Sequence, residues 1–267
     1  MSEDYYFAAD AEDAQELHRL RHLERQLDPM TKAAFAELGL RSGDKVLEVG
    51  PGAGSMLNHI AEAVGPQGHV TGLDMAPRFL KNIDAPNITV QTGNILDASI
   101  DGGPFDFVYA RFVLLHIPQV DEALARLFSL LRPGGRMLFV DLDFEPFGAV
   151  DPHDPRTGEF NALIDRYVTV LRERNVMELY FGRGLPVLLE RAGCVDVRGT
   201  GAVWSESGDT DNARFWRDSA VTTAALVQKL EPERTDLDVQ GALDAYDDPA
   251  FRFQTPTFMI ASGRRPL

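Results

Sequence analysis

The sequence predicts an α/β fold in which a parallel β-sheet is covered by helices on both faces. Apolar, strand-like runs alternate with helix-like segments between residues 45 and 144, and helical connections of this kind join parallel strands. A glycine-rich turn follows the first of these runs, where a helix begins. With 267 residues, of which 44% are hydrophobic, the chain can bury one large core with an added cap.

Residues 1–40 are predicted to form a helical N-terminal cap. The dipeptide Asp28-Pro29 is predicted to break the helical pattern, because proline lacks the N–H that a helix interior needs. Residues 31–38 then predict a second, shorter helix. The first helix is indicated by leucines at spacings of three and four, which place them on one face: Leu17, Leu20, Leu23 and Leu27.

Residues 41–150 are predicted to carry the core of the sheet. Helices are predicted at Ser55–Val64 and Asp121–Leu131, and the turn Pro133-Gly134-Gly135 is expected to separate the second helix from the next strand. The strand-like runs are apolar and bounded by turn residues. The five predicted strands are Lys45–Val49, His69–Asp74, Ile88–Thr92, Phe105–Ala110 and Arg136–Phe144.

Residues 151–267 are predicted to combine substrate-cap helices with the last two strands of the sheet. These strands are Val195–Val203 and Thr257–Ser262, and the roughly 50 residues between them far exceed what a hairpin needs. The intervening segment is therefore expected to be an inserted helical cap. The predicted helices of this part are Glu159–Glu178, Leu185–Ala192, Asn212–Leu230 and Asp236–Tyr246.

The glycine turn is the strongest indication of a binding site. Gly50, Gly52 and Gly54 occupy alternate positions, and Glu48 stands two residues before the first of them. Glycines let the backbone approach a ligand closely, and an acid at the end of the next strand, here Asp74, can hold a ribose hydroxyl pair. A nicotinamide-binding domain expects the different spacing Gly-x-Gly-x-x-Gly.

The spacing Glu48-x-Gly50-x-Gly52-x-Gly54 resembles the first motif of the class I S-adenosylmethionine (SAM) methyltransferases, which have a Rossmann-like seven-stranded sheet. Gly72-Leu73-Asp74-Met75 is similar to the second motif and Gly93-Asn94-Ile95 to the third, where Asn94 replaces the usual acid. The resemblance implies SAM as cofactor and S-adenosylhomocysteine (SAH) as its product. It further implies that Asp74 binds the ribose and that Met75 packs on the adenine. Asn94 and Ile95 are expected to border the adenine, and the amide oxygen of Asn94 to accept a hydrogen bond from its amino group. Arg111, just after the fourth strand, is expected beside the methionine part of SAM or in an ion pair with a nearby carboxylate.

Candidate catalytic groups are less clearly indicated. His116 is the candidate general base, because an ordinary imidazole titrates near neutral pH; the alternative is a structural histidine in an apolar run. Asp141 and Asp143 share one face of a strand, but nothing completes an octahedral oxygen shell, so no metal is expected. The acceptor pocket is predicted to be lined by Tyr5, Tyr6, His153, Phe160, Tyr167 and Trp204, each of which is alternatively a core or surface residue.

The composition of the chain limits the partners and the cellular location that are expected for it. The net charge of −15 disfavours nucleic acid, since phosphate binding relies on Lys and Arg. No apolar run has the length of a membrane span, and the lone Cys194 suits a reducing compartment, so a cytoplasmic location is expected. The predicted function is methyl transfer from SAM to a small organic acceptor, on O, N or C, in quinone-type or natural-product metabolism. A SAM-binding cyclase or isomerase and a nicotinamide-dependent oxidoreductase remain alternatives, and a homodimer is left open.

Overall fold

A computed structural model describes residues 13–233 and 239–267, and the chain divides into two compact units. The core unit extends to Asp141 and includes Arg183–Thr200 and Met259–Leu267. The insert unit comprises Leu142–Gly182 and Gly201–Phe258. Tyr5 and Tyr6, two of the predicted pocket residues, lie outside the described residues.

The described residues form a seven-stranded sheet in the order β3-β2-β1-β4-β5-β10-β7. Strands β1, β2, β3, β4 and β5 pair in parallel, which confirms the predicted α/β class. From β1, chain order runs outward through β2 and β3 on one side and through β4 and β5 on the other, while β10 inserts between β5 and β7. The direction of winding therefore changes between β1 and β4. The strands are β1 (Lys45–Val49), β2 (His69–Asp74), β3 (Ile88–Thr92), β4 (Phe105–Arg111), β5 (Leu131–Asp143), β7 (Val195–Ala202) and β10 (Thr257–Arg264).

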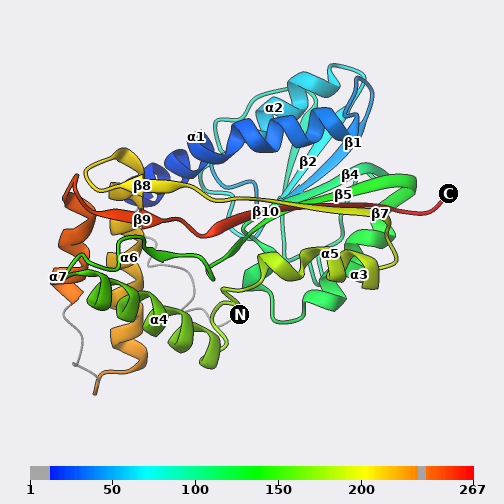
Figure 1. Cartoon of the computed structure of the whole chain (residues 1–267). Helices are drawn as coiled ribbons and strands as arrows, with labels where there is room; N and C mark the ends of the chain where they lie inside the picture. The colour runs from blue at the N-terminus through cyan, green and yellow to red at the C-terminus, as the bar shows by residue number, and fades with distance from the viewer. Residues whose placement is uncertain (1–12, 234–238) are drawn as a thin grey trace. The chain divides into compact units, whose positions relative to one another are not determined.

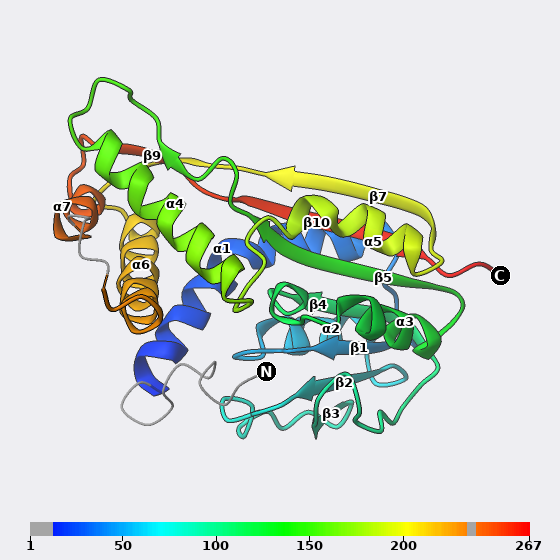
Figure 2. The ribbon, with the colours of Figure 1, turned by 90° about the horizontal axis from the view of Figure 1, so that it is seen from below.

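Helices cover both faces of the sheet in the core unit. Figures 1 and 2 show α1 (Asp13–Leu38) and α2 (Ser55–Val64) on one face, and α3 (Val120–Leu130) and α5 (Leu185–Arg191) on the other. The pattern of α2 explains its placement, because its apolar residues recur every three or four positions and are all buried. These residues are Met56, Leu57, Ile60, Ala61 and Val64.

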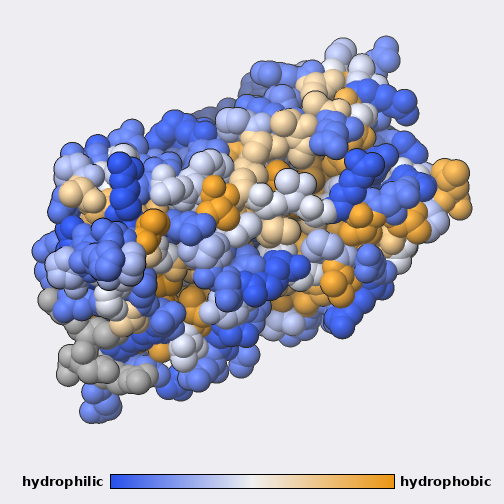
Figure 3. Space-filling view, viewed as in Figure 1, coloured by the Kyte–Doolittle hydropathy of each residue, from blue (hydrophilic) through white to orange (hydrophobic). Residues whose placement is uncertain are grey.

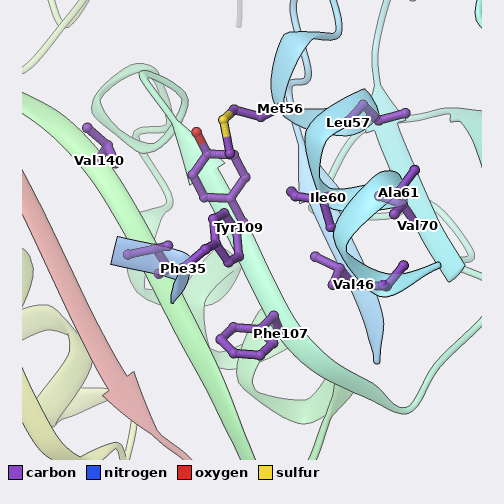
Figure 4. Packing of buried hydrophobic residues seen from close by; sticks show 12 residues of the cluster. Phe35, Val46, Met56, Leu57, Ile60, Ala61, Val70, Phe107, Tyr109 and Val140 are labelled. Atoms are coloured by element: carbon purple, nitrogen blue, oxygen red, sulfur yellow. The ribbon is translucent and has the colours of Figure 1, made fainter. Parts of the chain in front are cut away.

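The hydrophobic core beneath α1 and α2 is built around aromatic rings. Figure 4 shows Phe35 beside Tyr109 and Phe107, with Met56 and Ile60 of α2 on the other side. The ring of Phe35 meets that of Tyr109 edge-on, with centroids 5.2 Å apart, a geometry that aromatic quadrupoles favour. This packing holds the C-terminal part of α1 against Phe107 and Tyr109 of β4.

Helix α1 is continuous, so the predicted break at Asp28-Pro29 is wrong. Pro29 removes only one helical hydrogen bond, while Leu27 and Phe35 on either side of it are almost completely buried. Tertiary packing outweighs the local preference of proline here. The turn Pro133-Gly134-Gly135 also differs from the prediction: it lies within β5, where the register with β4 shifts between Phe105 and Phe107.

The insert unit contains three of the four helices predicted for residues 151–267 and an additional small sheet; the fourth, α5, belongs to the core unit. Its helices are α4 (Thr157–Glu173), α6 (Asp211–Leu230) and α7 (Val239–Asp244). Among the residues described, a three-stranded sheet in the order β6-β9-β8 accompanies them. Strands of two or three residues carry too little periodicity to be found in the sequence. They are β6 (Gly148–Ala149), β8 (Ser205–Ser207) and β9 (Arg252–Gln254).

Figure 3 shows one face of the molecule, on which hydrophilic residues surround apolar residues that gather over part of it and also occur singly. None of the helices in the described part of the chain is both long and apolar enough to span a bilayer.

Candidate functional site

The carboxyl ends of β1, β2 and β4 bring the predicted cofactor residues together in the core unit. Glu48 on β1 lies opposite Gly72 on β2 and Tyr109 on β4. Asp74 ends β2 and Arg111 ends β4, each beside the turn that follows β1. In open parallel sheets, ligands bind outside these strand ends where the winding changes direction.

The glycine turn has a backbone that other residues would strain. Gly50, Gly52 and Gly54 have φ values of 66°, 59° and 87°, in the left-handed region. A Cβ at Gly50 would lie 2.4 Å from Cγ2 of Val113, and one at Gly54 would lie 2.6 Å from Cδ1 of Ile83. Backbone conformation therefore favours glycine at all three positions, and lack of space adds to this at Gly50 and Gly54, whereas a Cβ at Gly52 would meet only Leu20 at 3.6 Å.

Glu48 is the most unusual group of the site. Its side chain is buried, and among the described residues its Oε2 atom has no hydrogen-bond partner. Burial raises the pKa of Glu48 to about 8, although the positive charge of Arg111 acts in the opposite direction. A buried polar atom without a partner is costly, so a ligand that donates to Glu48 would be bound favourably.

Asp74 and its neighbour Met75 border the turn on the β2 side. The Oδ1 atom of Asp74 accepts a hydrogen bond from the N–H of Ala76 at 2.7 Å. The segment after β2 forms turns rather than a helix, so Asp74 is not a helix N-cap. Burial raises the pKa of Asp74, and Met75 is 39% exposed.

Asn94 and Ile95 follow β3. Ile95 is buried, and the Oδ1 atom of Asn94 accepts from the N–H of Leu96 at 3.0 Å. An amide oxygen has two lone pairs, so this local bond leaves Asn94 able to accept a second one. Their roles toward adenine stay predictions.

Two acids on α1 complete the charged surroundings of the site, and sequence reasoning missed both. Glu24 Oε1 accepts from the N–H of Ser55, the first residue of α2, at 3.0 Å. Asp28 Oδ1 accepts from Ser55 Oγ and from Arg111 Nη1, each at 3.0 Å. The available signal was their spacing of four residues, which places two acids on one face of a helix.

Arg111 therefore forms the ion pair that was one of its two predicted roles. Its side chain and that of Asp28 are only 13% and 12% exposed. An open hollow of about 410 Å³ lies on the α1 side of this pair and is lined by Asp28 and Ser55, but not by Glu48 or Asp74. The strand ends, rather than this hollow, define the candidate cofactor site because they carry the glycine turn.

His116 lies in a 3₁₀ turn, Leu114–His116, shortly after β4. Burial and the positive charge of Arg19 lower the pKa of His116 to about 3. Backbone N–H groups of Leu114 and Leu115 donate to Asp141, which anchors the turn. His116 is thus neutral at physiological pH, but such a low pKa makes it a weak base.

The remaining predicted pocket residues belong to the insert unit. Phe160 packs 5.0 Å from the rings of Tyr246 and Phe251, and it is completely buried. Tyr167 is buried and donates its hydroxyl to Ala220 O at 3.0 Å. Trp204 packs on Phe258 with ring centroids 4.9 Å apart, while His153 is exposed in a loop. Their role as pocket residues stays a prediction.

In the described part of the chain, no group of three or more His, Cys, Asp or Glu side chains is arranged to hold a metal ion. Asp141 lies in the core unit and Asp143 in the insert unit. The N–H of Glu145 donates to Asp143 Oδ1 at 3.1 Å.

Comparison with known families agrees with this geometry. The model of the family described as "methyltransferase domain" matches residues 19–198, more than half of the chain, so the chain belongs to this family. With the strand order and the glycine turn, this makes it a member of the class I SAM-dependent methyltransferases, whose cofactor is SAM. The residues present fit that cofactor: a strained glycine cradle, a buried acceptor at Glu48 that lacks a described partner, and an acid at the end of β2.

Curated relatives are demethylmenaquinone methyltransferases. That of Listeria welshimeri is 31% identical over 117 residues, which is 41% of this chain and 50% of the relative. That of Staphylococcus aureus strain JH9 is 30% identical over 115 residues, covering 41% and 48%. The chain thus spans about half the length of the curated relatives it matches.

Solved structures share the fold. The YcgJ protein of Bacillus subtilis has a TM-score of 0.54 at 18% identity, covering 88% of this chain and 97% of that one. Phosphoethanolamine N-methyltransferase 2 of Haemonchus contortus, solved with phosphomonomethylethanolamine and SAH, has a TM-score of 0.53 at 14% identity, covering 90% and 53%.

Proposed function

We propose that this chain transfers the methyl group of SAM to a small organic acceptor. The observation that carries the proposal is the meeting of the glycine turn, Glu48 and Asp74 at the carboxyl ends of β1 and β2. These three features supply a close backbone approach, a buried acceptor and a hydroxyl-binding acid. The family match supports SAM over a nicotinamide cofactor.

SAM supplies an activated methyl group, which the acceptor takes as the carbon–sulfur bond breaks and SAH is left. The protein's task is then mostly to bind and orient the two reactants, which can provide much of the acceleration. Asp74 is proposed to hold the ribose hydroxyls, and Glu48 a donor group of the amino-acid part. His116, neutral and held on the turn after β4, is proposed to accept a hydrogen bond from the acceptor or to orient it.

The proposed acceptor class is a quinol-type or related small metabolite, methylated on O, N or C. The support is the similarity to demethylmenaquinone methyltransferases over the part of the chain that aligns. Of the predicted aromatic pocket residues, the partly exposed Trp204 suits an apolar acceptor by its chemistry, whereas Phe160 and Tyr167 are buried within the insert unit. A homodimer and a cytoplasmic location stay predictions.

Binding is tested by measuring thermal stabilisation with SAH and, separately, with NADH. We expect SAH to raise the melting temperature and NADH to leave it unchanged. A rise with NADH but not with SAH would refute the proposal. Asp74→Ala should weaken SAH binding by about 1–3 kcal/mol, the scale of a lost charged hydrogen bond. Asp84→Asn, an exposed acid in the loop between β2 and β3, is the matched control and should leave binding unchanged.

Transfer is tested with SAM carrying a labelled methyl group and a panel of quinols, catechols and small amines. Label in one product class identifies the acceptor. Binding of SAH without label in any product would instead support a SAM-binding cyclase or isomerase. The binding assay therefore tests whether SAM is the cofactor, and the labelling assay tests separately whether its methyl group is transferred.

A further inference from the structure

Asp28 occupies a junction between three elements of the core unit. Its Oδ1 atom accepts from Ser55 at the start of α2 and from Arg111 at the end of β4, each at 3.0 Å. Lys32 Nζ lies 3.6 Å from its Oδ2 atom, one turn further along α1. The carboxylate of Asp28 thus links α1 to the start of α2, directly after the glycine turn, and to the end of β4.

Arg111 has a second acid within its influence. Glu48 is 3% exposed, and its Oε2 atom has no partner in the described part of the chain. Arg111 is the strongest of the charges that act on Glu48, yet its guanidinium is bonded to Asp28. A buried carboxylate is normally paired, so the direction of Arg111 toward α1 needs a cause, and Asp28 provides it.

We propose that Asp28 is a positioning residue of the cofactor site: it holds the Arg111 guanidinium on α1 and so leaves Glu48 free to accept a hydrogen bond from the cofactor. The proposal rests on the proposed function, because it takes SAM as the ligand. Without the charge of Asp28, Arg111 would turn to Glu48, the nearby acid whose Oε2 lacks a partner in the described residues. The new ion pair would compete with the donor groups of SAM for the same carboxylate.

The test is a double-mutant cycle between Asp28 and Arg111, read by calorimetric titration with SAM. In the parent protein, D28N should weaken SAM binding about tenfold or more, the scale of one charge-assisted hydrogen bond. In the R111M background, the same D28N change should cost less than about threefold, because no guanidinium is left to occupy Glu48. In steady state, D28N should raise KM for SAM and leave kcat at saturating SAM within about twofold.

A structural role for Asp28 predicts a different result. If Asp28 acted only through Ser55 or Lys32, D28N would cost the same in both backgrounds, and the proposal would be overturned. The matched control is Glu37→Gln, which neutralises an acid on the same helix whose ion pair with Arg198, at 3.4 Å, is exposed to solvent. It should leave SAM affinity unchanged, and D28E, which keeps the charge, should retain most of it.

Two further readings keep the test decisive. If D28N fails to fold, a ¹³C NMR titration of the Glu48 carboxyl in the parent protein replaces the mutant cycle. A pKa above the ordinary range of glutamate supports the proposal. A pKa below that range shows that Glu48 pairs with Arg111 and overturns the proposal. Failure of the parent protein to bind SAM refutes the proposed function instead. Parent binding with equal D28N costs refutes only the role of Asp28.

Discussion

Replacing Glu48 by glutamine should change how the stability of the ligand-free protein depends on pH. Burial raises the pKa of Glu48 from 4.5 to about 8. Between these values the folded state keeps a proton that the unfolded chain releases, so the free energy of unfolding falls as pH rises. Each pKa unit corresponds to about 1.4 kcal/mol, so Glu48 removes roughly 4–5 kcal/mol of stability between about pH 4.5 and 8.

Glutamine keeps the shape of the side chain but cannot ionise. The stability of E48Q relative to the parent should therefore improve by several kcal/mol between about pH 5 and 8.5. Urea unfolding at half-unit pH steps, without cofactor, measures this difference. The exposed Glu62→Gln on α2 is the control and should show a constant difference across the same range.

Two results would refute the reasoning about Glu48. A difference between E48Q and the parent that stays constant from pH 5 to 8.5 would show that Glu48 ionises normally in the folded protein. An unchanged affinity for SAM in E48Q would show that its carboxylate does not accept from the cofactor. Loss of SAM affinity together with a gain of ligand-free stability at high pH is the outcome expected, and general destabilisation cannot produce it.

Three further changes test other parts of the structure. Gly54→Ala should destabilise the fold by about 1–3 kcal/mol in urea unfolding, because φ is 87° and Ile83 occupies the space, whereas Gly158→Ala in α4 has open space and should be neutral or slightly stabilising. The methyl-transfer rate should show no titration near pH 6.5 from His116, since its pKa is about 3; a limb at that pH that disappears in His116→Gln would contradict this. Arg265→Met should cost about 1–3 kcal/mol, because Arg265 Nη1 donates to the carbonyl oxygens of Phe128 and Ser129, each at 3.2 Å. Unfolding curves that match those of the parent would sink that last expectation.

Local sequence patterns predicted the sheet core with high fidelity. The bounds of β1, β2, β3 and α2 match the predicted ranges. In these segments the spacing of apolar residues, the glycines and the turn residues all favour the same secondary structure, so tertiary packing did not have to override local preference. The predictions were wrong where one residue was taken to decide the outcome, as Pro29 was in α1, or where strands of two or three residues carried no period.

The candidate site shows the same division. The glycines, Glu48, Asp74 and Arg111 could be singled out because each lies at or just beyond the end of a predicted strand. Glu24, Asp28 and the neutral state of His116 were not, because they depend on which side chains meet across 27 to 83 residues of chain and on how deeply they are buried. Spacing along the chain can place Glu24 and Asp28 on one face of a helix, but it does not show which side chains they meet.

By itself, the sequence determined the α/β class and the place of the glycine turn after the first strand, because these follow from backbone periodicity and from residues next to one another. The cofactor was indicated by the resemblance of the sequence motifs to those of the class I SAM methyltransferases. Only the tertiary structure decided that Arg111 pairs with Asp28 on α1, and that Glu48 is buried with one oxygen lacking a partner in the described residues. The physical reason is that desolvation and ion pairing depend on distances in space, which are set when α1 packs onto the sheet.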